Sequence, residues 1–526
     1  MISATRDSRD PAPRPTGGPL TDPLRNPRAV SGGLRTRRAL ILVLLTVLIP
    51  GTAQLLAGDR VLARRALRVT LTVWIGALTA VVLAVLDRQA ILDLLTHPVW
   101  SLVLTAVLIL LAAGWAFLFV DTLRLIRLSL LERRVRSMVA GLLAVLLLAT
   151  SGSLAYGAYV LGVGRATLGA VFQAGPALDP VDGRYNFLLM GGDAGEDRTG
   201  RRPDSISVIS VDASTGAVVT FSIPRNFQNA PFPPDSPLRE VYPDGYNCGD
   251  ECIINSLYTT VTENYAGLYP ESIDPGAEAM MDAASGVLGI TVQAYVLVDM
   301  NGFEELVDAM GGIKVDAGGW VPITAAEIPG TSPVRHYPPD GWIAPGVQTL
   351  DGYHALWYAR SREFVTDYER ISRQQCVQQA MIAQLDPATL LTRFQSIAAA
   401  GTQIVETDLP QDQLGSFVDL ALKAKNQPVR RLTIGPPDFG TPADNFVTYP
   451  DFAQVHNRVQ QELAAASEAA SAAYRAPAGL ERASLRTPAQ PADSGITEEY
   501  LQELATYGDD ATLGTLLENN GTCSPA

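Results

Sequence analysis

The sequence predicts an α/β sandwich domain that follows an N-terminal helical membrane region. Three observations support this prediction: long apolar stretches occur before residue 161, most carboxylates fall after residue 178, and the later part alternates short β-rich runs with helical patterns. Strands that alternate with helices are typical of a sheet covered by helices. We therefore expect one mixed domain behind the membrane region.

Composition divides the chain further. Its 526 residues exceed one ordinary domain, and 54 acidic against 40 basic residues give a net charge of −14. The first 38 residues are nonetheless rich in arginine, so we interpret 1–38 as a basic cytoplasmic leader. An acidic chain of this kind is not expected to bind nucleic acid.

The predicted membrane region covers residues 39–163 and contains four apolar stretches, at 39–58, 69–86, 99–120 and 138–160. Each of the last three is long enough to cross a hydrocarbon core of roughly 30 Å as a helix. The first is interrupted by Pro50 and Gly51. We therefore expect residues 39–58 to be re-entrant or interfacial.

The loops between these stretches predict the topology. Residues 59–68 contain four arginines and residues 121–137 contain five, whereas residues 87–98 lack that excess. Cytoplasmic loops are enriched in Lys and Arg. If all four stretches crossed, basic loops would lie on both sides and the large domain would be cytoplasmic. If residues 39–58 do not cross, every basic segment is inside, so we prefer a multi-pass cell-membrane protein with an extracytoplasmic C-terminal domain.

Four cysteines agree with that location: Cys248, Cys252, Cys376 and Cys523 all lie in the part placed outside. An even number in an oxidising compartment predicts disulfides. Of the three pairings, we predict Cys248 with Cys252 and Cys376 with Cys523, because the first two are near neighbours in a loop. The alternative, zinc binding, is disfavoured because no His is near.

In the first half of the outer domain, residues 185–190 predict a buried strand that leads into Gly191, Gly192 and Asp193. Runs 205–212 and 218–223 predict a hairpin, from which Arg225 emerges. Helical patterns cover 251–264, 277–288 and 302–310, with a strand at 294–299.

In the second half, residues 351–357 predict a short helix, 358–362 an extended segment and 368–385 a longer helix. Arg370, Arg373 and Gln374 can share one face of that helix. We expect further helix to about residue 425, and we assign 475–526 to a linker and tail. The remaining predictions are a strand at 429–434, a helix at 451–474, an Ala- and Pro-rich linker at 475–494 and a helix at 498–507.

Two charged clusters carry the predicted chemistry. The first contains Asp193, Arg202, Asp204 and Arg225, and the second begins with Arg360-Ser361-Arg362. Carboxylate oxygens suit Mg²⁺, and arginines bind phosphate oxygens bidentately. The pair of clusters therefore predicts a phosphoryl-transfer site. Motifs for nucleotide hydrolysis, serine hydrolysis and zinc proteolysis are missing from the sequence.

An ordered series of motifs, over roughly residues 182–400, resembles the LytR-CpsA-Psr family. Its members are Asn186–Asp193, Arg202-Pro203-Asp204, Ile223-Pro224-Arg225, Gly302-Phe303, Gly311-Gly312, Leu350-Asp351-Gly352, Tyr358-Ala359-Arg360-Ser361-Arg362 and Arg370-Ile371-Ser372-Arg373-Gln374. The resemblance implies an extracytoplasmic α-β-α domain, here 182–474, with an apolar tunnel for a lipid. It also implies an Mg²⁺-dependent phosphotransferase. Such an enzyme moves a glycopolymer from a polyprenyl-pyrophosphate carrier to a peptidoglycan hydroxyl and forms a phosphodiester.

Carried over by position, the resemblance gives roles to individual residues. Asp193 and Asp204 would hold the metal and, with Arg202, form the catalytic set. The pyrophosphate would be bound by Arg202, Arg225, Arg360, Arg362, Arg370 and Gln374, with Arg373 beside them. The family usually has Asp where this chain has Asn226, which argues against proton transfer at that position. Two alternatives remain open: a polyprenyl-pyrophosphate pyrophosphatase, and a non-catalytic binding or regulatory protein of the envelope.

Overall fold

A computed structural model gives the fold. It describes residues 31–86, 91, 94–95, 97–172, 177–193, 201–249, 251–332, 334–384, 405–425, 427–441, 446–475, 496–518 and 523–525. Most of the predicted leader and the 475–494 linker lie outside these residues. The chain divides into two compact units, Met1–Leu86 with Leu102–Leu161 and Asp87–Ser101 with Gly162–Ala526.

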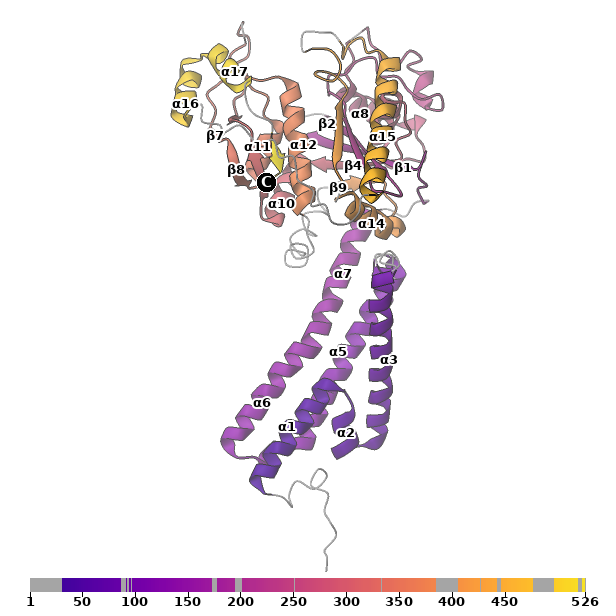
Figure 1. Cartoon of the computed structure of the whole chain (residues 1–526), viewed down its shortest axis with the longest axis vertical. Helices are drawn as coiled ribbons and strands as arrows, with labels where there is room; N and C mark the ends of the chain where they lie inside the picture. The colour runs from indigo at the N-terminus through magenta and orange to yellow at the C-terminus, as the bar shows by residue number, and fades with distance from the viewer. Residues whose placement is uncertain are drawn as a thin grey trace, which may run out of the picture. The chain divides into compact units, whose positions relative to one another are not determined.

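The first unit is helical (Figure 1). Its described elements are α1 (Gly32–Leu48), α2 (Thr52–Ala57), α3 (Arg60–Leu86), most of α5 (Pro98–Ile126), α6 (Arg133–Leu147) and the first part of α7 (Ser153–Val171). Among the described residues, three helical stretches are by length and composition long and apolar enough to cross a membrane: Arg60–Leu86, Pro98–Leu130 and Arg133–Val171. They contain the last three apolar stretches predicted from the sequence.

The predicted interruption of the first apolar stretch is confirmed, since α1 ends at Leu48 and α2 begins at Thr52. Gly51 between them has φ +101°, and a Cβ there would lie 2.8 Å from the Cβ of Ala66, so the turn requires glycine. In α2 the wholly buried Gln54 donates from Nε2 to the Leu118 carbonyl and to Thr122 Oγ1, each at 3.2 Å. These bonds hold α2 against α5.

The second unit is built on a six-stranded sheet of order β10-β3-β2-β1-β4-β9. The strands are β1 (Arg184–Asp193), β2 (Arg202–Asp212), β3 (Val218–Ser222), β4 (Ala294–Asp299), β9 (Val405–Thr407) and β10 (Val429–Thr433). The β1–β4 and β10–β3 pairs are parallel, and the β1–β2, β2–β3 and β4–β9 pairs are antiparallel. The predicted hairpin is therefore the β2–β3 pair.

Helices cover both faces of this sheet. Because side chains alternate along β1, Leu188 and Met190 enter the main core while Phe187 and Leu189 face the other side. The main-core face carries α8 (Ile254–Asn264), α9 (Pro275–Leu288) and α15 (Phe452–Arg475). The other face carries α10 (Met300–Met310), α12 (Asp367–Gln384) and α14 (Leu414–Ala424). The predicted α/β class is confirmed.

The second unit also contains a smaller region, built from residues that come before and after α11 (Gly352–Arg360) in the sequence. It contains one sheet of β11 (Ser524–Pro525), β5 (Ile313–Ala317) and β8 (Gly346–Leu350), and a second of β6 (Val321–Ile323) and β7 (Gly341–Ile343). Helices α16 (Glu498–Tyr507) and α17 (Asp510–Glu518) pack against it. These short strands and α17 were not predicted. Strands of two to five residues carry too little periodicity to be recognised from the sequence.

Two predictions of secondary structure were wrong. Residues 358–360 continue α11 rather than forming an extended segment, because the Ser361 amide still donates to the Trp357 carbonyl at 2.9 Å. The helix expected up to residue 425 is interrupted by β9, where Thr407 pairs with Val296 of β4. Pairing with a neighbouring strand overrides the weak local preference of so short a run.

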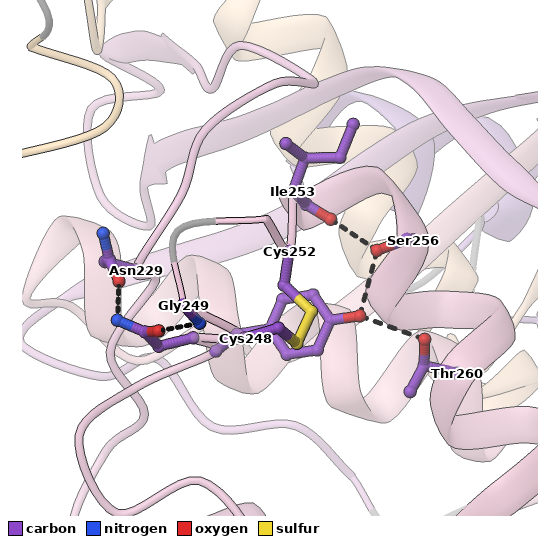
Figure 2. The surroundings of a disulfide bond; sticks show 9 residues. Asn229, Cys248, Gly249, Cys252, Ile253, Ser256 and Thr260 are labelled. Carbon is purple, nitrogen blue, oxygen red and sulfur yellow. Dashed lines mark hydrogen bonds between the residues drawn. A yellow bond between two sulfur atoms is a disulfide. The ribbon is translucent and has the colours of Figure 1, made fainter.

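The predicted disulfides are both present, Cys248–Cys252 and Cys376–Cys523. Figure 2 shows the first beside Ser256 and Thr260, whose hydroxyls both lie within 3.0 Å of the Tyr246 hydroxyl. The second joins the buried face of α12 to the C-terminal tail across a sequence separation of 147 residues.

Asp408 gives the fold a predicted pH dependence. Burial raises the pKa of its carboxyl from 3.8 to about 6, although the Tyr295 amide donates to its Oδ1 at 2.8 Å. The folded state therefore binds more protons than the unfolded state between these values, so stability falls as pH rises from about 4 to 6. Asp408→Asn, which keeps the acceptor, is expected to raise the free energy of unfolding at pH 7 by about 1–2 kcal/mol. Denaturation curves between pH 4 and 8 would test this, and an unchanged slope in the variant would contradict it.

Candidate functional site

A cavity of about 530 Å³ lies against the face of the sheet opposite the main core. Its walls join two kinds of surface. Charged and polar side chains include those of Asp204, Arg225, Asp299, Arg360, Arg362, Glu363, Arg370 and Gln374, and apolar ones include those of Leu189, Val298, Phe303, Leu306, Leu356, Trp357, Val377 and Met381. Such a cavity can hold an anionic group next to a hydrocarbon chain.

The hairpin places Asp204 beside Arg225. Ser207 of β2 pairs with Ser222 of β3, so residues just beyond the paired region come to lie opposite each other. Arg225 Nη1 donates to Asp204 Oδ1 at 2.6 Å, with the two side chains 24% and 32% exposed. The pair is thus open enough to contact a ligand while each partner orients the other.

Helix α12 is fixed to this end of the sheet by two buried side chains. Arg370 donates from Nη1 to the Asp204 carbonyl at 2.8 Å, and its Nε and Nη2 donate to the Asp367 carboxylate at 2.9 and 3.1 Å. Gln375 donates to Ser222 Oγ at 2.8 Å. These bonds set the position of Gln374, which lies between them in sequence and lines the cavity.

Residues 360–363, the arginine turn, follow α11 and present Arg360 and Arg362 to the cavity. Glu363 Oε2 accepts from Ser361 Oγ at 3.0 Å and from the Arg362 amide at 2.8 Å. The Arg360 guanidinium lies 4.8 Å from the centre of the Trp357 ring, a cation-π contact. The turn is therefore held from inside by its own carboxylate.

Arg373 supports the arginine turn from below instead of lining the cavity. It donates from Nε to the Tyr358 carbonyl at 2.9 Å and from Nη2 to the Ser361 carbonyl, and only 8% of the residue is exposed. The expectation that it shares a ligand-facing surface with Arg370 and Gln374 was therefore wrong. Burial lowers the pKa of this guanidinium and raises the pKa of Tyr358 to about 12. The Tyr358 hydroxyl thus stays protonated at neutral pH.

The remaining predicted residues are placed less directly. Arg202 is exposed at the first position of β2 and is not among the described residues that line the cavity. Asp193 ends β1 and pairs through its backbone with Arg202, but its side chain lies outside the described part.

The fit of Mg²⁺ can be tested on the donors present. Among the described residues, no group of three or more His, Cys, Asp or Glu side chains gathers to hold a metal. Mg²⁺ is commonly held by one or two carboxylates together with substrate phosphates. Asp204, a hard oxygen donor in the cavity wall, fits that arrangement.

Sequence reasoning missed Glu363 and did not name the side chains of the apolar wall, although the resemblance implied an apolar tunnel. Glu363 follows Arg362 directly, so its place in the chain was a signal that it could bond the turn. Phe303 and Trp357 carried no such signal, because apolar residues on a helix usually enter a core.

A model of the LytR_cpsA_psr family matches residues 172–464, more than half of the chain. The chain belongs to this family. The resemblance inferred from the motifs is confirmed.

Relatives of this family member are roughly a quarter identical to it over the aligned residues. Cell wall biosynthesis protein LcpA of Corynebacterium glutamicum is 29% identical over 52% of this chain and 54% of LcpA. Polyisoprenyl-teichoic acid–peptidoglycan teichoic acid transferase TagU of Bacillus cereus is 27% identical over 44% of this chain and 62% of TagU. The crystal structure of TagV of Bacillus subtilis is 22% identical in sequence, covers 53% of this chain and 97% of TagV, and has a TM-score of 0.37. The chain spans about half to three-fifths of the length of the first two relatives.

Proposed function

We propose that this family member is a phosphotransferase that moves a glycopolymer from a polyprenyl-pyrophosphate carrier to a peptidoglycan hydroxyl. One observation carries the proposal: the wall of a single cavity has arginine side chains in one part and apolar side chains in another. A polyprenyl pyrophosphate has the same two parts, an anionic head and a hydrocarbon tail. The transferase activity named for TagU supports the choice of reaction.

In the proposed complex the pyrophosphate lies among the charged and polar side chains of the cavity wall. Arg225 flanks it from the end of β3, Arg360 and Arg362 from the arginine turn, and Arg370 and Gln374 from α12. Arginine binds phosphate oxygens bidentately, and donors fixed before the reaction stabilise charge that develops in the transition state. The apolar wall would hold the first isoprene units and exclude water from one side of the head group.

The reaction exchanges one phosphorus–oxygen bond for another. The acceptor hydroxyl oxygen attacks the phosphorus that bears the saccharide, the bond to the bridging oxygen breaks, and polyprenyl phosphate leaves with the bridging oxygen. The hydroxyl proton passes to a base, for which Asp204 and Asp193 are the candidates. With water as the attacking group the same site would act as a pyrophosphatase.

Mg²⁺ is the proposed cofactor. When bound, it would neutralise charge on the pyrophosphate oxygens. Asp204 and Asp193 are the residues that would hold it, while Arg225 would keep the Asp204 carboxylate oriented through their 2.6 Å ion pair.

For the membrane region we propose three crossings and a re-entrant α1–α2 pair, which places the domain of residues 182–474 outside the cell. The three long apolar helices and the break at Gly51 support this arrangement. Paired cysteines in the second unit support it too, because disulfides persist in oxidising compartments. The donor lipid and the peptidoglycan acceptor would then both be within reach.

Saccharide transfer by the full-length protein would test the function. The detergent-solubilised chain would be mixed with Mg²⁺, a polyprenyl-pyrophosphoryl saccharide and peptidoglycan oligomers. Saccharide joined to peptidoglycan through a phosphodiester is the expected product. Release of polyprenyl phosphate without acceptor modification would instead establish a pyrophosphatase, and tight binding without turnover a binding protein.

Asp204→Asn is expected to lower this transfer by about 10²-fold or more, because the amide can neither take up a proton nor offer a charged metal ligand. The protein should still fold, since the backbone carbonyl that Arg370 uses is unchanged. Asp412→Asn is the matched control, as Asp412 is exposed and is not among the described residues that line the cavity. Equal activity of the two variants would remove Asp204 from the mechanism.

A further inference from the structure

The C-terminal hairpin, residues 496–518, lies beyond the segment that matches the family model. It consists of α16 and α17, and the buried side chains Leu501, Ala505, Leu513 and Leu517 form a small core with Trp342. This core is separate from the main core under the six-stranded sheet. Its stability therefore depends on what the hairpin packs against.

The hairpin packs against the residues that follow the arginine turn. Phe364 and Val365 are partly buried against its core, and a Cβ on Gly514 would lie 3.3 Å from the Phe364 carbonyl. The Val365 amide donates to the Arg362 carbonyl at 3.3 Å, which links this contact to the turn itself. Phe364 has φ +66°, a left-handed conformation that a non-glycine residue keeps only when its surroundings hold it.

Polar contacts fix the hairpin in the same place. Asp510 Oδ2 accepts from the His336 amide at 2.9 Å and lies 3.1 Å from its Nδ1, and the His336 ring is 4.6 Å from that of Phe364. Trp342 Nε1 donates to Gln502 Oε1 at 2.8 Å. The tail beyond the hairpin is tied to α12 by the Cys376–Cys523 disulfide and to β5 through β11. Each contact restricts movement of the hairpin away from Phe364.

We propose that the C-terminal hairpin is a brace that positions the arginine turn for the pyrophosphate of the lipid donor. Within the arginine turn Glu363 accepts from the Arg362 amide, and Arg373 donates to the Ser361 carbonyl from below. The hairpin packs against Phe364 and Val365, the two residues that follow the turn. Leu513 and Phe364 are then positioning residues, since they act on the ligand only through Arg362. The inference rests on the proposed function for the identity of the ligand, but its structural part does not.

The test compares two leucines that are buried in different cores. Leu513→Ala removes apolar side-chain volume from the hairpin core, whereas Leu463→Ala makes the same change on α15, in the main core. Binding of geranylgeranyl pyrophosphate to the full-length protein with Mg²⁺ would be measured well below both unfolding temperatures, together with hydrogen–deuterium exchange of residues 361–366. We expect Leu513→Ala to raise the Kd about tenfold and to speed that exchange. Leu463→Ala should change the Kd by less than about twofold.

Two further variants of the hairpin core, Leu513→Met and Trp342→Phe, separate a loss of positioning from a general loss of folding. Leu513→Met should restore wild-type affinity, because it refills the core with similar volume. Should Leu513→Ala fail to fold, Trp342→Phe removes the donor to Gln502 and part of the ring that packs in the hairpin core, and should still speed exchange in residues 361–366. Equal effects of the two Leu→Ala changes, or unchanged exchange in the turn, would overturn the brace.

Failure of the proposed function gives a different result. In that case the wild-type protein does not bind geranylgeranyl pyrophosphate, or binds it as well with Arg362→Ala. The exchange data alone then decide on the brace: faster exchange of residues 361–366 in Leu513→Ala but not in Leu463→Ala supports it, and no difference between them overturns it.

Discussion

Arg362→Ala is expected to lower saccharide transfer by about 10²- to 10³-fold, the usual loss when one fixed donor is removed from a developing anion. Arg362 lines the cavity, and its main chain is fixed at both ends, by Glu363 Oε2 on its amide and by the Val365 amide on its carbonyl. The alanine variant keeps both backbone bonds. The loss should therefore come from the guanidinium alone and leave the unfolding temperature unchanged.

Arg362→Lys should recover only part of this rate, because an ammonium group cannot bind two phosphate oxygens in the planar manner of a guanidinium. A suitable control is Arg458→Ala, which removes a half-exposed arginine that pairs with Glu462 on α15. Transfer would be followed with a labelled saccharide at several donor concentrations. Full activity of Arg362→Ala would show that the arginine turn does not contact the donor.

Arg373→Ala is expected to damage both the fold and the activity. Its guanidinium is buried and bonds the carbonyls of Tyr358 and Ser361, two residues that are each 1% exposed. Its removal leaves those acceptors unpaired away from water, at a cost of about 2–5 kcal/mol in the free energy of unfolding. Transfer should fall as well, since Ser361 lies between the two arginines of the turn. Denaturation of the solubilised protein and the transfer assay would measure the two effects.

Neighbours of Arg373 on the same helix separate these effects. Gln374→Ala should weaken donor binding without loss of stability, because Gln374 lines the cavity. Ser372→Ala should change neither, because Ser372 is exposed and is not among the described cavity-lining residues. If Gln374→Ala lost as much stability as Arg373→Ala, Gln374 would be a supporting side chain like Arg373 and not a ligand-facing one.

Residues next to strand ends were the most predictable part of the candidate site. Asp204 lies near the start of β2 and Arg225 just after β3, so a hairpin of alternating apolar residues was enough to bring them together. The roles of Arg370 and Arg373 were not predictable in the same way. Both have helical spacing toward one face, yet Arg370 reaches the cavity and Arg373 reaches two carbonyls beneath the turn.

By itself the sequence determined the apolar helices, the break at Gly51, the nearness of Cys248 to Cys252 and the motifs that give family membership. These features depend on local composition, on backbone sterics or on short ordered runs. Only the tertiary structure decided that Arg373 supports the arginine turn and that residues 496–518 pack behind it. The physical reason is that a side chain's partner is set by which distant backbone lies within a few ångströms, and local periodicity carries no information about that distance.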